Sequence, residues 1–318
     1  MRIIFAGSPA FAVPSLERLL STGHDVVGVI TQPDRPAGRG LKLRPSPVKE
    51  LAVRHGLALF QPEKFNTKSF LDCVESMEPD LILVVAYGKI FRRRSLAIPK
   101  LGCVNLHASL LPKYRGIAPV NWAIINGECE TGVTTIFMDE GIDTGDMIIS
   151  KPAAIGPDET AGEVLGRLAV LGAGVVAETC DLIARAEAPR RKQDESGASY
   201  APKLSKQEGW IRWELPSEDV HNLIRGVTPW PGALAVHGDR PVKILRTRLS
   251  EESKDSAGTV IGVDSHKGIL VSCGKGSLWL AKVQAQGRKA VNGADFARGY
   301  RIKVGDRFDS KTQQDLKG

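Results

Sequence analysis

Short apolar, β-branched runs alternate with helix-like stretches through the first part of the chain, and this alternation constrains the fold more than any other feature. The runs predict strands at Arg2–Ala6, Asp25–Thr31, Leu81–Ala86, Gly102–Leu106, Val133–Met138 and Met147–Ser150. Helical spacing predicts helices at about 12–22, 46–55, 67–77, 117–126 and 158–187. Strands that alternate with helices build a mostly parallel α/β sheet covered on both faces.

The pattern changes after about residue 187. Residues 188–205 are polar and contain Pro and Gly, so they predict a linker. Beyond them, short runs separated by Gly, Asp or Ser turns predict strands at Ala233–Val236, Val242–Thr247, Gly258–Val263, Gly268–Ser272 and Ser277–Val283. We therefore expect a domain at 1–187 and a second domain at 206–318, the latter a small antiparallel β-barrel or sandwich.

The composition of the 318 residues is typical of a soluble two-domain enzyme. The sequence contains no run of 18 apolar residues, so it predicts no membrane-spanning helix. Gly7, Ser8 and Pro9 interrupt the N-terminal apolar run too early for a signal peptide. The five cysteines form no C-x-x-C pair. These features indicate a protein of the reducing cytoplasm that does not associate with membranes.

The net charge of +7 is unevenly distributed. Residues 1–205 hold 24 Lys and Arg against 23 Asp and Glu, and residues 206–318 hold 19 against 13. The second domain therefore carries a net +6, which indicates either a basic surface kept for solubility or a polyanionic partner such as a nucleic acid.

Three polar segments are candidates for chemistry. Asn105 and His107 lie two residues apart at the carboxyl end of a predicted strand, so both side chains point to the same face and together can hold a carbonyl oxygen as it gains charge. The glycine-punctuated loop at 138–147 contains four carboxylates, and one of them can orient His107. Its spacing does not match a calcium EF-hand, and we expect no metal. The structural alternatives are a hairpin or metal-binding loop at 138–147, and at His107 a histidine whose hydrogen bonds are satisfied within a turn.

The third segment, residues 32–45, carries four cations within ten residues, three of them Arg39, Lys42 and Arg44. Such a run is often a solvated surface, but beside an active site it can clamp phosphates. The glycine fingerprint of dinucleotide-binding folds is absent, since Pro9 and Ala12 stand where glycines belong. We therefore expect the α/β domain to bind something other than a dinucleotide.

These segments, in this order, resemble the folate-dependent formyltransferases over nearly the whole chain. The resemblance rests on RIIFAGSPAFAVPSLERLL, TQPDRPAGRGLKLRPSPVK, VVAYGKI, VNLHASLLPKYRGIAP, ETGVTTIFMDEGIDTGDMI, YAPKLSKQEGWIRW and PWPGA. The PDRPAGRG loop and the basic second domain are similar to those of the members that formylate a charged tRNA. Ile117 departs from the small residue usual at its position, a change expected to leave function undisturbed.

The resemblance implies a Rossmann-like domain followed by an OB-like barrel that binds tRNA. It implies that Asn105, His107 and Asp143 are catalytic, and that Ser109, Leu110, Leu111 and Pro112 border the tetrahydrofolate site. It also implies that Arg39, with Lys42 and Arg44 in the same loop, meets the acceptor end of the tRNA.

The implied reaction transfers the formyl group of 10-formyltetrahydrofolate to the α-amine of initiator methionyl-tRNA, with no metal and with the protein acting as a monomer. A sugar-nucleotide formyltransferase and a catalytically inactive RNA-binding module are the alternatives. From the sharp turn beside the folate segment, we also expect a cis peptide bond before Pro112.

Overall fold

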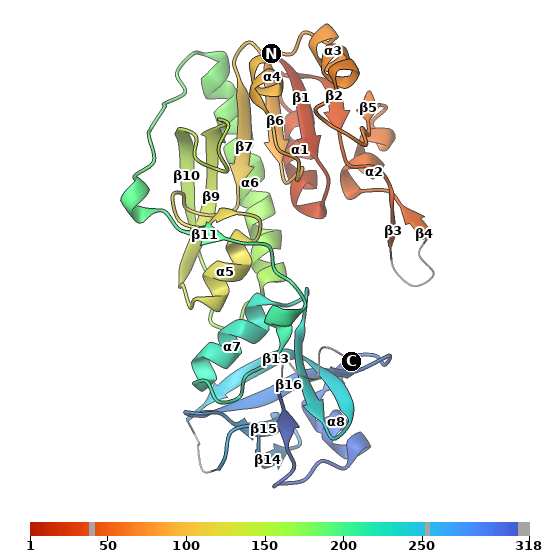
Figure 1. The fold of residues 1–318 in the computed structure, drawn as a ribbon, viewed down its shortest axis with the longest axis vertical. Helices are drawn as coiled ribbons and strands as arrows, with labels where there is room; N and C mark the ends of the chain where they lie inside the picture. Colours follow the sequence, from red (N-terminus) through yellow and green to blue (C-terminus); the bar gives the residue numbers. More distant parts are fainter. Residues whose placement is uncertain (38–41, 252–254, 311–318) are drawn as a thin grey trace. The chain divides into compact units, whose positions relative to one another are not determined.

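The structure is a computed structural model that describes residues 1–37, 42–251 and 255–310. Its contacts divide the chain into two compact units (Figure 1). The first unit comprises Met1–Ile117, Thr131–Ala153 and Leu165–Ala201, and the second comprises Ala118–Glu130, Ala154–Val164 and Pro202–Gly318. Each unit contains segments that are distant in the sequence, so neither is one continuous stretch of chain.

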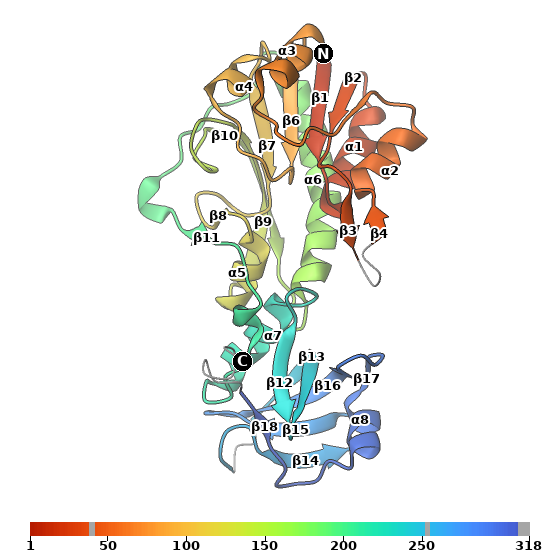
Figure 2. The ribbon, with the colours of Figure 1, turned by 45° about the vertical axis from the view of Figure 1, so that its right-hand side comes forward.

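A seven-stranded sheet forms the centre of the first unit (Figure 2). The strand order is β10-β9-β7-β6-β1-β2-β5. Strands β1, β2, β5, β6 and β7 run parallel, and β9 is antiparallel to β7. The bounds are β1 (Arg2–Gly7), β2 (Asp25–Ile30), β5 (Leu59–Phe60), β6 (Leu81–Val85), β7 (Cys103–His107), β9 (Glu130–Phe137) and β10 (Met147–Ala154). The predicted mostly parallel sheet is confirmed.

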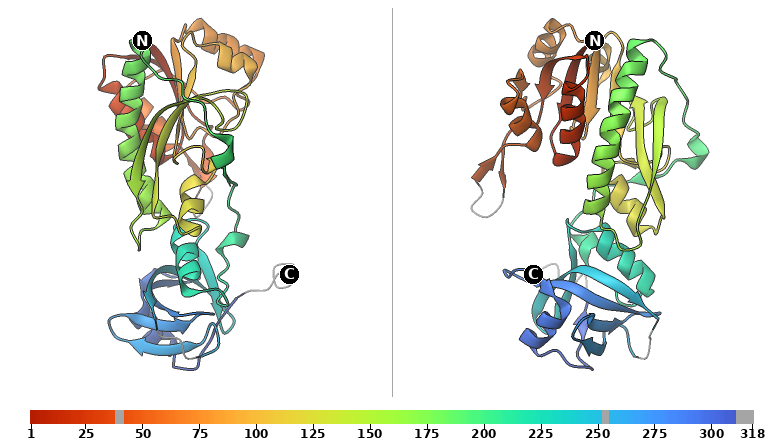
Figure 3. Two further views of the ribbon diagram at one scale, coloured as in Figure 1. Left: turned by 90° about the vertical axis from the view of Figure 1, so that its left-hand side faces the viewer. Right: turned by 180° about the vertical axis from the view of Figure 1, so that it is seen from behind.

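Helices cover both faces of this sheet, with α1 and α6 on one face and α3 and α4 on the other (Figure 3). The bounds are α1 (Val13–Leu20), α2 (Pro47–Arg54), α3 (Lys68–Ser76), α4 (Arg93–Ala97) and α6 (Ala161–Ala184). Of these, only the short α4 was not predicted. No helix in the described ranges is long and apolar enough to cross a membrane.

Local sequence sets where these helices begin. The hydroxyl of Ser46 accepts the backbone N–H of Lys49, and Pro47 follows at the first helical position of α2. At α6, the backbone N–H and the hydroxyl of Thr160 both donate to the Glu163 carboxylate. The backbone N–H of Glu163 donates to the Thr160 hydroxyl in return, so the two residues form a reciprocal cap.

The second unit contains an antiparallel sheet that curls until its ends meet. The path runs β14-β15-β16-β13-β12-β18, and β17 pairs with β16. Thr259, just before β14, bridges Arg307, just before β18, so backbone hydrogen bonds join the two ends of the path. Of the two predicted architectures, the barrel is therefore the correct one. The bounds are β12 (Ala233–His237), β13 (Arg240–Ser250), β14 (Val260–Asp264), β15 (Gly268–Ser272), β16 (Ser277–Ala285), β17 (Val291–Asn292) and β18 (Phe308–Asp309).

Helices α5 (Pro119–Ile125), α7 (Ser217–Gly226) and α8 (Gly293–Tyr300) complete the second unit. Residues of α7 and α8 enter the apolar core of the barrel together with Trp213 and Phe308. Helix α5 packs on α7, and Asn121 donates to the carbonyl of Gly226 at 2.7 Å. Helix α8 was not predicted.

Two small sheets lie outside the main ones. Strand β3 (Arg35–Ala37) pairs with β4 (Lys42–Arg44) and frames the basic loop of residues 32–45. Strand β8 (Arg115–Gly116) pairs in parallel with β11 (Tyr200–Ala201). The segment predicted as a linker therefore contains a strand that pairs close to the strand end of His107.

Candidate active site

Asn105, His107 and Asp143 meet at the carboxyl end of β7. The amide nitrogen of Asn105 donates to Oδ1 of Asp143 at 3.1 Å, and Nδ1 of His107 lies 3.4 Å from Oδ2 of the same carboxylate. His107 is 5% exposed, and Asn105 and Asp143 are half-buried. The structure thus brings together the three side chains that the sequence singled out, at the edge where open α/β sheets bind ligands.

The second ring nitrogen of His107 defines the protonation chemistry of this group. Nε2 lies 2.8 Å from the main-chain carbonyl of Tyr114. Since a carbonyl only accepts, the hydrogen belongs on Nε2, and Nδ1 is the nitrogen that gains or loses a proton. The Asp143 carboxylate lies against Nδ1.

Asp143 is held in an uncommon backbone conformation. Its φ is +55°, in the left-handed region, and the backbone N–H of Gly116 donates to its Oδ2 at 2.9 Å. Gly145 lies two residues further on, where any Cβ would overlap the carbonyl oxygen of Phe137. The tight turn that presents the carboxylate therefore requires glycine at position 145.

Residues Ser109–Pro112 follow His107 closely and form a fixed loop. The Leu111–Pro112 peptide is cis, which confirms the prediction. Ser109 is 1% exposed, and its hydroxyl donates to the carbonyl of Lys113 at 2.6 Å. Leu111 is buried and Leu110 is half-buried. The hydroxyl of Ser109 thus shapes the loop, and the loop presents backbone and apolar surface rather than a polar side chain.

Sequence reasoning missed Arg115 and Gln193. The guanidinium of Arg115 is fully buried and binds the side chains of Gln193 and Glu195. Glu195 raises the pKa of Arg115, and hydrogen bonding from Arg115 lowers the pKa of Glu195. The sequence does hold a signal for Arg115, because an Arg-Gly pair follows shortly after the candidate catalytic residue His107. Gln193 lies in a polar stretch that carries no such signal.

The basic loop is only partly described. Arg39 lies outside the described residues, and so does the side chain of Lys42. Arg44 is exposed at the end of β4, where its backbone pairs with that of Arg35. The structure therefore shows the hairpin that frames the loop, and the role of Arg39 itself stays a prediction from the sequence.

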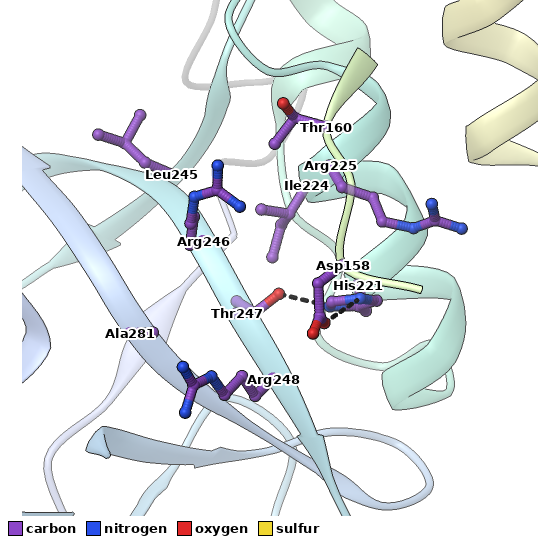
Figure 4. Close-up of a pocket in the computed structure, with 10 residues that line it drawn as sticks. All are labelled: Asp158, Thr160, His221, Ile224, Arg225, Leu245, Arg246, Thr247, Arg248 and Ala281. Atoms are coloured by element: carbon purple, nitrogen blue, oxygen red, sulfur yellow. Dashed lines mark hydrogen bonds and ion pairs between the residues drawn. The ribbon is translucent and has the colours of Figure 1, made fainter. Parts of the chain in front are cut away.

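A separate cavity of about 160 Å³ lies within the second unit, and none of the predicted catalytic residues line it (Figure 4). His221 is buried there and contacts the Thr247 hydroxyl at 2.7 Å, while its other ring nitrogen donates to the Pro157 carbonyl at 2.9 Å. Burial lowers the pKa of His221. With both ring nitrogens engaged, this histidine serves the packing of α7 on β13.

Arg246 and Arg248, two exposed residues of β13, also line that cavity. Lys282 on β16 lies opposite Arg246, Trp279 lies opposite Arg248, and the Lys267 ammonium sits 5.4 Å from the Trp279 ring centroid. We call these five residues the basic face. Arg246 forms an ion pair with Glu163, whereas Arg248 and Lys282 are exposed and have no ion-pair partner in the part of the chain that the structure describes.

No cluster of three His, Cys, Asp or Glu side chains within the described ranges is arranged to hold a metal ion. The site around Asn105 instead offers hydrogen-bond donors. The side-chain amide nitrogen of Asn105 carries two hydrogens, and one of them is donated to Asp143. The second can be donated to an oxygen atom of a bound substrate.

Comparisons with known proteins agree with this geometry. A family model described as "Formyl transferase" matches residues 1–179, and one described as "Formyl transferase, C-terminal domain" matches residues 203–301. Among solved structures, the sugar 3N-formyl transferase WlaRD has a TM-score of 0.66 at 21% identity, covering 91% of this chain and 99% of its own. A methionyl-tRNA formyltransferase from Clostridium thermocellum has a TM-score of 0.55 at 16% identity, with 79% and 94% covered.

These matches, with the fold and the three grouped side chains, define a formyl transferase. Among curated proteins, the methionyl-tRNA formyltransferase of Geotalea uraniireducens (strain Rf4) is 46% identical over 98% of this chain and 99% of its own length. That of Geobacter sulfurreducens is 47% identical over 97% and 96%. The chain belongs to the methionyl-tRNA formyltransferase family.

Proposed function

We propose that this enzyme transfers the formyl group of 10-formyltetrahydrofolate to the α-amine of methionine on initiator methionyl-tRNA. The observation that carries the proposal is the convergence of Asn105, His107 and Asp143 at the strand ends, in a chain similar along its whole length to named methionyl-tRNA formyltransferases. The product would be N-formylmethionyl-tRNA for translation initiation.

The folate supplies an activated formyl group, and the residues of this chain supply positioning and charge stabilisation. Asn105 has an amide N–H for the formyl oxygen. As the amine attacks the formyl carbon, His107 would accept the amine proton at Nδ1, with the Asp143 carboxylate beside the resulting imidazolium. The same proton would pass to N10 of the folate as the bond from N10 to the formyl carbon breaks, which leaves tetrahydrofolate and the formylated amine. The loop at Ser109–Pro112 would border the folate, with half-buried Leu110 and Pro112 as its accessible apolar side chains.

The tRNA would contact two parts of the protein. Arg39, Lys42 and Arg44 belong to the basic loop, which we assign to the acceptor end. The basic face of the second unit is assigned to backbone phosphates, since its exposed cations surround a half-buried tryptophan. A sugar-nucleotide substrate would require neither feature.

A sugar-nucleotide formyltransferase is the second candidate, because the solved structure of WlaRD shares this fold. At 21% identity that likeness concerns the fold alone. The discriminating experiment incubates the protein with 10-formyltetrahydrofolate and either charged initiator tRNA or an amino-sugar nucleotide. Formylation of the tRNA alone supports the proposal, and formylation of the sugar alone overturns it. A protein that binds tRNA but formylates neither would be the inactive RNA-binding module.

We also propose that the enzyme works in the cytoplasm as a monomer. All five cysteines are free thiols, which suits a reducing compartment. Light scattering of the purified protein tests the monomer, and a dimeric mass would contradict it.

A further inference from the structure

The side chain of Arg115 is buried in a way that demands partners. Its guanidinium is fully buried, and removing such a charge from water is costly unless it is paired. It donates twice to Oε1 of Gln193, from Nε at 3.1 Å and from Nη2 at 2.9 Å. It also forms a two-pronged pair with Glu195, at 2.9 and 2.8 Å. Both partners lie 78 and 80 residues further along the chain, within the segment predicted as a linker.

Gln193 uses the other end of its side chain on the loop of Asp143. The amide nitrogen donates to the main-chain carbonyls of Asp143 at 2.7 Å and of Gly145 at 2.9 Å. Because Arg115 can only donate and a carbonyl can only accept, the orientation of the amide group is unambiguous. Gln193 therefore links Arg115, which precedes Gly116, to the turn that presents the Asp143 carboxylate.

These bonds close a circuit around the His107–Asp143 pair. Tyr114 and Gly116, the two neighbours of Arg115, hold His107 through a carbonyl and Asp143 through an N–H. The side chain of Arg115 holds Gln193, and Gln193 holds the backbone of Asp143. Every member of the circuit lies in the first unit.

We propose that Gln193, fixed by Arg115, is a positioning residue that keeps the Asp143 carboxylate in register with Nδ1 of His107. Asp143 adopts a left-handed backbone conformation that is unfavourable for a non-glycine residue, so external contacts are needed to keep it there. The two carbonyl contacts of Gln193 supply that constraint through the backbone, whereas Gly116 acts on the carboxylate itself. This inference deepens the proposed function and rests on it.

The sharpest variant is Gln193→Glu. A glutamate keeps the acceptor for Arg115 and the shape of the side chain, but it loses both donors to the Asp143 loop. We expect kcat to fall about 10- to 100-fold, because a displacement of about 1 Å in a catalytic group can cost 10²-fold. KM for both substrates should stay near wild type. Lys192→Ala, an exposed neighbour, is the matched control and should leave kcat unchanged.

A double-mutant cycle distinguishes positioning from a general structural role. If Gln193 acts through the Asp143 carboxylate, Gln193→Glu should cost little more once Asp143→Ala has removed that carboxylate. Multiplicative losses in the double variant would overturn the proposal, as would a Gln193→Glu enzyme with kcat within about threefold of wild type or one whose loss lies wholly in KM.

A readout without substrate separates this proposal from the proposed function. The Gly116 amide proton donates to Asp143, so its NMR shift and exchange protection report the carboxylate directly. Gln193→Glu should move the shift and lower the protection, and Lys192→Ala should do neither. An unchanged Gly116 signal would overturn the positioning role, whereas failure of wild-type protein to formylate tRNA would overturn only the proposed function.

Discussion

Arg246 on β13 is paired with Lys282 on β16 where the antiparallel ladder shifts register, so two cations are neighbours across the two strands. Like charges on neighbouring strands destabilise a sheet. Glu163 pairs with Arg246 and offsets part of that repulsion, while Lys282 is exposed. A phosphate bound at the basic face, as proposed above, would relieve the remainder.

Replacing Arg248 and Lys282 by glutamine should therefore weaken the binding of every tRNA. Each phosphate that is no longer neutralised reduces the slope of log affinity against log salt by about 0.7–0.9, so two such phosphates reduce it by about 1.5. Affinity measured between low and moderate salt checks this. Lys303→Gln removes the same kind of charge from an exposed position outside the basic face. An equal effect per charge at Lys303 would mean that net charge alone attracts the RNA.

Arg39→Ala should act differently from these barrel variants. The arginine is expected at the acceptor end, so its loss should lower kcat/KM for the initiator and shrink the initiator's advantage over an elongator tRNA. KM for the folate should be unchanged. A variant that lost only folate affinity would contradict the assignment of this loop to tRNA.

His107→Ala should remove most turnover while the protein stays folded. Loss of an acid–base group typically costs about 10²- to 10⁴-fold. Rates at saturating substrate check this, with the exposed His266→Ala as the matched control. Activity within a few-fold of wild type would exclude the proposed proton transfer at Nδ1.

Asn105→Ala and Asp143→Asn should cause losses similar to that of His107→Ala. The variant that combines all three changes should be little worse than the worst single one, because groups that act as a unit are not additive. Three independent, multiplying losses would show that the hydrogen-bonded group does not work as one.

The lowered pKa of Glu163 predicts that the stability of the folded protein depends on pH in the acid range. Hydrogen bonds from the backbone and hydroxyl of Thr160, assisted by Arg246, lower the pKa of Glu163 to about 2 from an ordinary value of 4.5. A carboxyl whose pKa is depressed by folding stabilises the folded state above its unfolded value, and that contribution is lost as pH falls toward about 2. Glu163→Gln should be less stable than wild type at neutral pH, and the two should converge as the pH approaches that folded-state pKa.

Urea midpoints at several pH values test this prediction. Glutamine preserves the acceptor for Thr160, so the comparison isolates the charge. The same substitution at exposed Glu17 should leave the dependence of the urea midpoint on pH parallel to that of wild type. A constant difference between wild type and Glu163→Gln at all pH values would contradict the assignment.

The sequence was sufficient for elements with a long apolar pattern. The strand predicted at Leu81–Ala86 ends one residue from the observed β6, and the helix predicted at about 67–77 encloses α3. Strands of two residues, such as β5 and β8, are too short for periodicity to reveal. Their pairing is decided by tertiary contacts rather than by local preference.

The same distinction applies to the site. Asn105 and His107 were predictable because strand geometry places residues two apart on one face. The approach of Asp143 depends on a left-handed backbone and on a turn with space only for Gly145. Gln193 was not predicted, because a single polar residue in a segment without periodicity does not indicate that its partner is an arginine 78 residues away.

The way the chain is shared between the two units limits how such an enzyme can be recombined. The polypeptide passes from one unit to the other five times, after residues 117, 130, 153, 164 and 201. A chimera joined at residue 202 would import a foreign barrel but keep the native α5, whose Asn121 bonds to Gly226 of α7. Exchange of the whole second unit between relatives would therefore require the grafting of Ala118–Glu130 and Ala154–Val164 together with the barrel.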